Sequence, residues 1–216
     1  MITIHHSGIR ALLSDRQIGN LIREFQENHF IRLRNLVDES LLNELFDQMN
    51  GANWENRVHD GIGIEVCLAD AGLVALFNFL MNDQELFQLI QQITNCGFIG
   101  CFQGRIYRMI PSEGHYDSWH TDVGEDRLLA LSLNLGKEIH EGGVLQIRSK
   151  DSERLIEAPN PSFGDAVLFR LSPALKHRVT NVTGNQPKTA FAGWFKSSPD
   201  LYSTLTELAQ SNPPAS

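Results

Sequence analysis

Apolar positions in the first 95 residues recur at spacings of three and four, which is the period of a helix that buries one face. Ser14 can cap the first of these segments, in which Ile18, Leu21 and Phe25 share a face. The pattern predicts helices over residues 14–27, 38–50, 71–81 and 83–95. It also predicts a short strand at 30–33, a loop or loose hairpin at 52–69, and a helix at 203–210 in the C-terminal tail.

The pattern changes near residue 97, where short alternating segments replace the helical period. The predicted strands cover residues 98–109, 116–122, 128–135, 143–148, 153–157, 166–170, 175–182 and 188–195. Clusters of Pro and Gly separate them, as in Pro111–Gly114 and Gly184–Pro187. So many closely spaced strands favour a sandwich or a small barrel.

Length and composition limit the classes of protein that the chain can represent. Its 216 residues suit one domain, with 1–96 as mainly helical support, 97–196 as the β core and 199–216 as a tail. The formal net charge of −8 argues against a general nucleic-acid binder. Three cysteines without a Cys-x-x-Cys spacing argue against a disulfide framework. The absence of a signal-peptide pattern and of a long apolar run predicts a cytoplasmic protein without a membrane segment.

A histidine and a carboxylate are two positions apart in the predicted strand 116–122. On a regular strand His120 and Asp122 project from the same face. Either His140 or His177 could supply a third ligand, and two histidines with one carboxylate form the facial triad of non-haem Fe(II) sites. A second pair, His115 and Asp117, has the opposite parity, so we expect it to face away from the metal.

Further motifs decide between these possibilities. His177-Arg178-Val179-Thr180-Asn181-Val182 precedes a turn at Gly184, and Lys188 and Trp194 lie on the strand that follows. With His120-Thr121-Asp122 and Gly142-Gly143-Val144-Leu145, this order resembles the Fe(II)/2-oxoglutarate-dependent oxygenase superfamily, specifically its prolyl-4-hydroxylase-like members. The resemblance covers about residues 100–196.

The resemblance implies a fold and a set of ligands. The fold would be α+β, a double-stranded β-helix (jelly-roll) barrel with the N-terminal helices packed on its major sheet. His120, Asp122 and His177 would be catalytic and would hold Fe(II), and Lys188 would pair with the far carboxylate of 2-oxoglutarate. The candidate cosubstrate residues are Lys188, Tyr107, Ser132 and Asn134. The candidate substrate residues are Arg105, Tyr116, Ser118 and Trp194.

The implied activity is hydroxylation of an unactivated C–H bond in an amino-acid, peptidyl or natural-product substrate. Dioxygen would be consumed, and succinate and CO2 would be released. The partners would be that substrate and dioxygen, with no nucleic acid and no membrane. The alternative is a noncatalytic double-stranded β-helix protein that binds a metal or a ligand. A cupin is disfavoured because the sequence lacks a His-x-His pair at this position and gives Lys188 no role.

Overall fold

The computed structural model describes residues 2–124, 126–150 and 154–198. The predicted tail helix at 203–210 and the start of the predicted strand 153–157 lie outside these residues. The helices are α1 (Asp15–Asn28), α2 (Glu39–Met49), α3 (Ala71–Met81) and α4 (Gln84–Thr94). All four agree with the predicted ranges to within about a residue at each end. The described helices lack the length or the apolar character needed to cross a membrane.

Short polar side chains fix the helix starts because they bind backbone N–H groups that lack intrahelical partners. Ser14 begins α1, where it exchanges hydrogen bonds with Gln17 in a capping box. An aspartate caps each of the others: Asp38 for α2, Asp70 for α3 and Asp83 for α4.

The strands form one large sheet and three small ones. The large sheet has the order β3-β12-β8-β15-β6-β5-β4, with β7 paired to β5. Its strands are β3 (Phe30–Leu33), β4 (Trp54–His59), β5 (Gly63–Leu68), β6 (Cys101–Met109), β7 (Tyr116–Asp117), β8 (Arg127–Asn134), β12 (Ala166–Arg170) and β15 (Lys188–Lys196). The small sheets pair β11 (Leu155–Ala158), β10 (Leu145–Ser149) and β13 (Leu175–Val179), then β9 (Glu141–Gly142) with β14 (Val182–Thr183), and β1 (Ile2–His5) with β2 (Gly8–Ala11).

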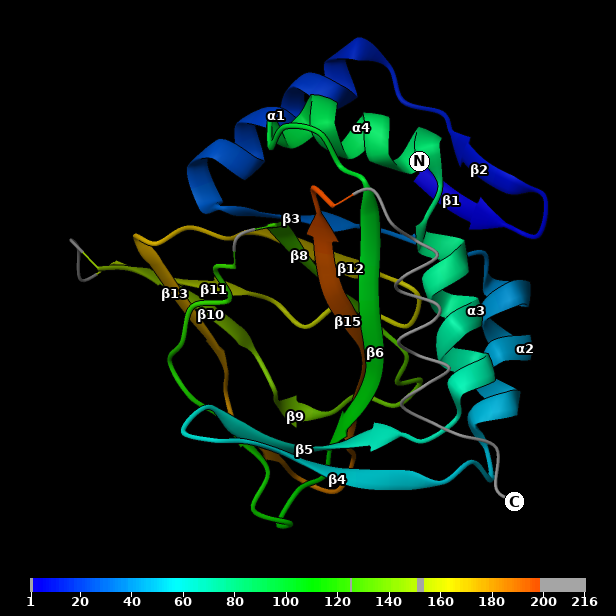
Figure 1. The fold of residues 1–216 in the computed structure, drawn as a ribbon, viewed down its shortest axis with the longest axis vertical. Coiled ribbons are helices and arrows are strands. Elements are labelled where there is room, and N and C mark those ends of the chain that lie inside the picture. Colours follow the sequence, from blue (N-terminus) through cyan, green and yellow to red (C-terminus); the bar gives the residue numbers. More distant parts are fainter. Residues whose placement is uncertain (1, 125, 151–153, 199–216) are drawn as a thin grey trace.

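The large sheet is curled, and its two faces have different neighbours (Figure 1). The helices lie on one side, while β10, β11 and β13 face the other side. This is the double-stranded β-helix expected from the sequence.

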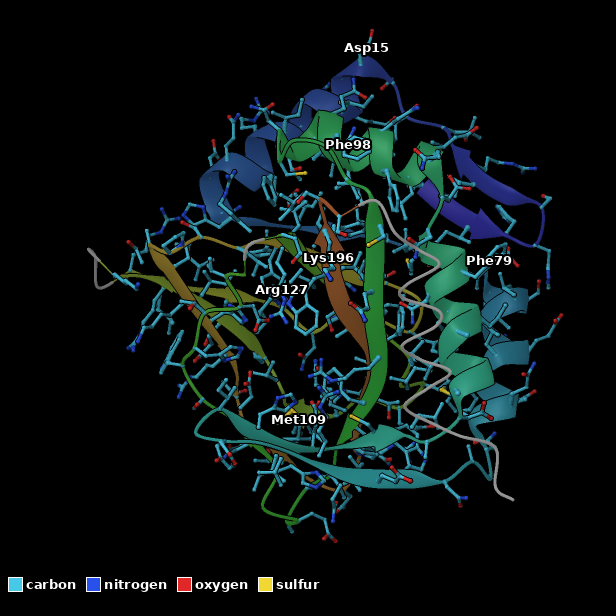
Figure 2. The ribbon with its side chains drawn as sticks, viewed as in Figure 1. Asp15, Phe79, Phe98, Met109, Arg127 and Lys196 are labelled. Atoms are coloured by element: carbon cyan, nitrogen blue, oxygen red, sulfur yellow. The ribbon has the colours of Figure 1, made fainter. Side chains whose placement is uncertain are left out.

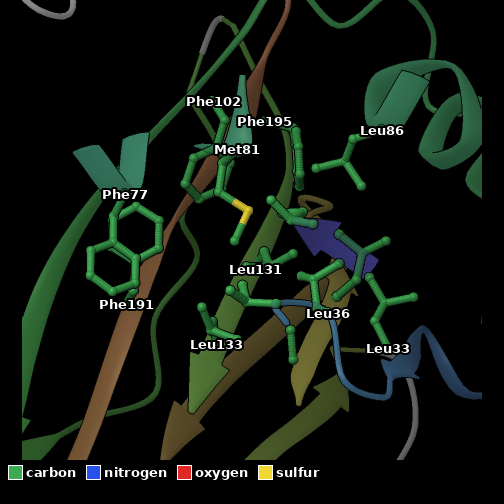
Figure 3. Packing of buried hydrophobic residues seen from close by; sticks show 14 of the residues in the cluster. Leu33, Leu36, Phe77, Met81, Leu86, Phe102, Leu131, Leu133, Phe191 and Phe195 are labelled. Carbon is green, nitrogen blue, oxygen red and sulfur yellow. The ribbon is translucent and has the colours of Figure 1, made fainter. Parts of the chain in front are cut away.

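The hydrophobic core fills the space between the helices and the large sheet (Figure 3). Phe191 and Phe195 on β15 point into it, and each packs against Phe102 of β6. Phe77 of α3 stacks on Phe191 with ring centroids 5.1 Å apart. Because strand side chains alternate, Ala192 and Trp194 project from the opposite face of β15. The core and the cavity described below therefore share this strand but not its side chains.

The structure differs from the predicted secondary structure at three places. The N-terminal hairpin β1–β2 was not predicted. Residues 52–69, predicted as a loop or loose hairpin, form the regular hairpin β4–β5, which extends the large sheet through pairs between β5 and β6. The predicted strand 116–122 ends at Asp117, because the chain turns away to meet β13 through a single bridge between His120 and His177.

Candidate metal centre

Three side chains converge beside the bridge that joins the loop after β7 to β13. Ligand atoms of His120, Asp122 and His177 all lie within 4.8 Å of one another. The carboxylate of Asp122 lies between the rings, 3.6 Å from His120 Nε2 and 3.4 Å from His177 Nε2. Two imidazoles and one carboxylate are a donor set that suits Fe(II) and leaves one side of the ion open. His140 is not part of this cluster.

The two histidines are held together through their backbones. The N–H of His120 donates to the carbonyl of His177, and the N–H of His177 donates to the carbonyl of His120, both at 3.0 Å. The ring of His177 also packs edge-on against Phe169 of β12. The distance between the two ligands is thus set by main-chain pairing.

Asp117 lies beside the cluster, contrary to the parity argument. Residues 118–122 are not a strand, so the period of two does not continue past Asp117. Asp117 Oδ1 lies 3.4 Å from His120 Nδ1, and Oδ2 accepts the N–H of Val179 at 2.7 Å. Burial raises the pKa of Asp117, and nearby His120 opposes this rise. His115, by contrast, accepts the N–H of Ile110 through Nδ1, a contact within its own loop.

Asp122 has two further partners, one predicted for another role and one missed. Trp194 Nε1 donates to Asp122 Oδ2 at 2.9 Å, so this predicted substrate residue contacts the carboxylate itself. Arg127 lies with Nη1 3.6 Å from Asp122 Oδ1, and its guanidinium stacks 3.8 Å over the ring of Trp194. Figure 2 labels Arg127 beside β15. No sequence motif distinguishes Arg127 from other charged strand ends.

These contacts determine the charge states of the cluster. Burial alone would raise the pKa of Asp122, but hydrogen bonds from His120, His177 and Trp194 hold it well below its usual range. Burial alone would lower the pKa of His120, but hydrogen bonds with Asp122 and with the carbonyl of Ser118 raise it to about 9. Asp122 is therefore an anion at neutral pH, as a metal ligand must be.

A cavity of about 610 Å³ opens beside the cluster, between the large sheet and the strands β10, β11 and β13. Lys188 lies in its wall with only 6% of its surface exposed. Its ammonium has no hydrogen bond or ion pair with any residue that the structure describes. Burial lowers the pKa of Lys188 to about 8. A buried, unpaired cation is costly unless an anion joins it, so the cavity suits a negatively charged ligand.

The other predicted cosubstrate residues divide into two groups. Tyr107 and Ser132 line the cavity, and burial raises the pKa of the Tyr107 hydroxyl while a hydrogen bond with Ser132 opposes the rise. Asn134 lies outside the cavity lining. Its amide donates to the carbonyls of Gly136 and Pro161 and accepts the N–H of Gly136, so the structure does not bring it to the site.

The predicted substrate residues are also divided. Arg105 lines the cavity, where its Nε donates to Glu65 Oε1 at 2.7 Å. Burial opposes the charge of Arg105, but the ion pair with Glu65 outweighs it and raises its pKa. Tyr116 lies in the lining and is partly exposed. Ser118 is outside it and donates its hydroxyl to the carbonyl of Gly61.

The hairpin β4–β5, predicted from the sequence as a loop or loose hairpin, contributes one wall of the cavity. Glu65, Arg57 and His59 all line the cavity, although this segment precedes the β core in the chain. Glu65 was not predicted as a site residue. Only its pairing with Arg105, 40 positions later, marks it as a site residue.

Comparison with known proteins agrees with this geometry. Residues 103–196 match the family model described as the 2OG-Fe(II) oxygenase superfamily. This segment contains the three clustered residues and Lys188. No curated protein sequence matches the chain.

Solved structures with the same fold share little sequence with the chain. An oxidoreductase of the 2OG-Fe(II) oxygenase family from Burkholderia pseudomallei has a TM-score of 0.63 at 14% identity, covering 87% of this chain and 94% of its own. A prolyl-4-hydroxylase from Pseudomonas putida scores 0.62 at 18% identity, covering 84% and 99%. A prolyl hydroxylase from Trichoplax adhaerens, in complex with a hypoxia inducible factor peptide fragment, scores 0.64 at 15% identity, covering 84% and 90%.

Proposed function

We propose that the chain, whose residues 103–196 match the 2OG-Fe(II) oxygenase superfamily, is a 2-oxoglutarate-dependent dioxygenase that hydroxylates an unactivated C–H bond. The substrate in this proposal is an amino acid, a peptidyl residue or a natural product. The cofactors are Fe(II) and 2-oxoglutarate. We also propose that residues 1–216 work as one domain.

The observation that carries the proposal is the position of the three clustered side chains beside a cavity that contains an unpaired cation. His120, Asp122 and His177 would hold the metal. Lys188 would pair with the far carboxylate of 2-oxoglutarate, which supplies the anion that its buried ammonium lacks. When bound, Fe(II) and 2-oxoglutarate supply the activation of dioxygen that the protein's own side chains cannot provide.

The remaining residues would position these groups and limit access by water. Trp194 contacts Oδ2 of Asp122 and Arg127 contacts Oδ1, so both would hold this carboxylate in place. Tyr107 and Ser132 give the cavity wall two hydroxyls. Arg105 and Glu65, together with Tyr116, lie where a substrate would contact the hairpin β4–β5.

The class of substrate is the finer part of the proposal. The Trichoplax adhaerens prolyl hydroxylase was solved with a peptide, which supports a peptidyl substrate for the protein studied here. The Arg105–Glu65 pair offers a substrate both a donor and an acceptor within the cavity wall. Such a pair can recognise the polar backbone of a peptide, or a free amino acid.

An anaerobic titration tests the metal site. Metal-free protein is loaded with Fe(II) and then with 2-oxoglutarate, and the visible charge-transfer band of the chelate is followed. We expect a band in the wild type and its loss in Asp122→Ala, because one of three ligands is gone. Asp126→Ala is the matched control, since Asp126 pairs with Lys196 away from the cluster. Its band should equal that of the wild type.

Two outcomes would reject the proposal. A full band in Asp122→Ala would mean that the metal lies elsewhere. No band in folded, iron-loaded wild type would leave a noncatalytic metal-binding or ligand-binding β-helix protein.

Once the band has been observed, candidate peptides and amino acids are added in the presence of air. Succinate release that depends on the candidate, together with a product heavier by one oxygen atom, identifies hydroxylation.

A further inference from the structure

Arg105 and Glu65 form an ion pair in the cavity wall that leaves several of their polar atoms unused. The pair is largely shielded from water, with 24% of the Arg105 side chain and 13% of the Glu65 side chain exposed. Nε of Arg105 donates to Oε1 of Glu65 at 2.7 Å. Among the described residues, the two terminal nitrogens of Arg105 have no hydrogen-bond partner, and neither has Oε2 of Glu65. Both residues line the cavity, so these atoms are available to a ligand there.

Trp194 connects this ion pair to the metal centre. Cζ of Arg105 lies 5.7 Å from the centroid of the Trp194 ring. The indole N–H of the same residue donates to Oδ2 of Asp122 at 2.9 Å. One indole therefore separates Arg105 from a residue that would hold the metal. A ligand bound to Arg105 can extend a short carbon chain along this ring toward the three-residue cluster.

The charges around the pair limit which ligand fits. Arg105 and Glu65 balance each other, and an additional net charge in a shielded cavity is costly. His59 adds none, because burial and the charges of Arg57 and Arg105 lower the pKa of its ring, which lies 3.7 Å from Glu65 Oε1. A ligand with one negative and one positive group keeps the balance. Each of its groups would also form a charge-assisted hydrogen bond, which is stronger than a neutral one.

We propose that the substrate is a free α-amino acid, whose carboxylate binds the terminal nitrogens of Arg105 and whose ammonium binds Oε2 of Glu65. A carboxylate matches the planar fork of a guanidinium, which can donate two parallel hydrogen bonds to it. A residue inside a peptide chain offers neither charged group. The inference rests on the proposed function and selects one of its substrate classes.

Binding of free and blocked amino acids tests the inference without measuring turnover. The protein is loaded with Mn(II) and 2-oxoglutarate, and binding of the standard L-amino acids is measured by ligand-detected NMR and then by calorimetry. Each amino acid that binds is measured again as its N-acetyl form, as its C-terminal amide and with both blocks. We expect each single block to weaken binding by about 10-fold or more, because it removes a hydrogen bond between charged groups. The doubly blocked form represents a peptidyl residue and should bind least.

Variants assign each preference to one side chain. Arg105→Met should bind the amino acid and its C-terminal amide equally weakly, and Glu65→Gln should no longer distinguish the amino acid from its N-acetyl form. Arg108→Met is the matched control, since Arg108 lies on the same strand but outside the cavity lining, where its Nε donates to Thr189. Its ligand preferences should equal those of the wild type.

Removing one member of a shielded ion pair leaves the other charge unpaired, which destabilises a fold. If circular dichroism shows that a single variant is unfolded, the double variant Arg105→Met/Glu65→Met is measured, because it removes both charges. It should lose both preferences.

Three results would overturn the inference. They are a wild type that binds no free amino acid, a doubly blocked form that binds as tightly as the free one, and preferences that persist in the double variant. A wild type that does not bind 2-oxoglutarate would instead contradict the proposed function. The preference for free amino acids is then still measured on the Mn(II) protein, since Arg105 and Glu65 lie outside the metal cluster.

Discussion

At the scale of single residues, Trp194 links the cavity wall to the carboxylate that would bind the metal. Its indole N–H is the shortest contact that Asp122 makes with a neighbouring side chain among those described, at 2.9 Å. Groups that orient a metal ligand often matter nearly as much as the ligand itself, because they fix the direction of its lone pairs. The stacked guanidinium of Arg127 holds the indole in this orientation.

Trp194→Phe should weaken metal binding without unfolding the protein. The phenyl ring keeps most of the packing area but cannot donate to Asp122, which then loses a contact that fixes its rotamer. We expect metal affinity to fall about 10-fold, at the lower end of the range for such outer contacts. Titration with Mn(II) or Zn(II) against a competing chelator measures the change.

Trp119→Phe is the control for this prediction. Trp119 also packs against guanidinium groups, those of Arg148 and Arg178, but it does not line the cavity. Metal affinity in this variant should match the wild type. A comparable fall in both variants would show that the loss of an indole acts through stability rather than through Asp122.

The sequence can predict a site residue when that residue belongs to a motif that is recognisable along the chain. His120, Asp122, His177 and Lys188 follow a recognisable order along the chain, and the structure brings them to one cavity. Glu65 and Arg127 could not be found in this way, since each acquires its role only by contact with a distant residue. Ser118 and Asn134 lie outside the cavity lining, because their polar atoms bond to backbone carbonyls of Gly61 and Gly136 instead.

At the scale of elements, α3 docks on the large sheet through two asparagines one helical turn apart. Asn78 donates to the carbonyl of Gly104 at 2.9 Å and accepts its N–H at 2.7 Å. Asn82 makes the same pair of bonds with Phe102, at 2.8 and 2.9 Å. Along this part of β6 the neighbour β5 pairs only with residues 107 and 108. The side-chain amides of Asn78 and Asn82 thus take the place of a neighbouring strand. They bond to backbone groups of β6 that would otherwise lack partners.

Asn78→Ala should destabilise the fold by about 2–6 kcal/mol, because two buried backbone groups of Gly104 lose their partners at about 1–3 kcal/mol each. Urea unfolding followed by circular dichroism measures the loss. Gln48→Ala, at an exposed position of α2, should change stability by less than about 0.5 kcal/mol. If Asn78→Ala lowered the free energy of unfolding as little as the control does, water would be able to replace the asparagine as the partner of the Gly104 backbone groups.

Helices and strands are predicted well where neighbouring residues carry a clear apolar pattern and a cap. The helices combine a regular apolar face with a polar cap, so their ranges were correct to within about a residue. The hairpin β4–β5 lacks a buried face along most of β4, so alternation gave no strand signal there. The segment 116–122 has strand-like composition, but the tertiary bridge to His177 interrupts it.

At the scale of the whole molecule, the cavity holds a charge that the fold itself does not balance. In the unfolded chain Lys188 keeps its proton up to about pH 10.5, whereas in the folded protein its pKa is about 8. Between these values the unfolded state binds more protons, so stability from this group rises with pH. His140, on which the charge of Lys188 acts, has a pKa of about 4 and so stays neutral throughout this range.

The affinity for 2-oxoglutarate should therefore fall as pH rises above about 8. Below pH 8 Lys188 is already charged, so the affinity does not change with pH. Above pH 8 the lysine must take up a proton when the ligand binds, so the affinity falls about 10-fold for each further pH unit. Calorimetry on metal-saturated protein between pH 6.5 and 9.5 measures this profile. Lys188→Met should bind more weakly and show no such bend. A bend at the same pH in that variant would assign it to another group.

The mutual backbone bonds of His120 and His177 have a consequence for the order of assembly. The loop and the strand that carry the ligands are joined by main-chain pairing, and the hydrophobic core lies on the other face of the large sheet. Small metal-dependent modules fold only around their ion. Here His120 and His177 are already held in place by the backbone, so binding of an ion would cost little conformational entropy.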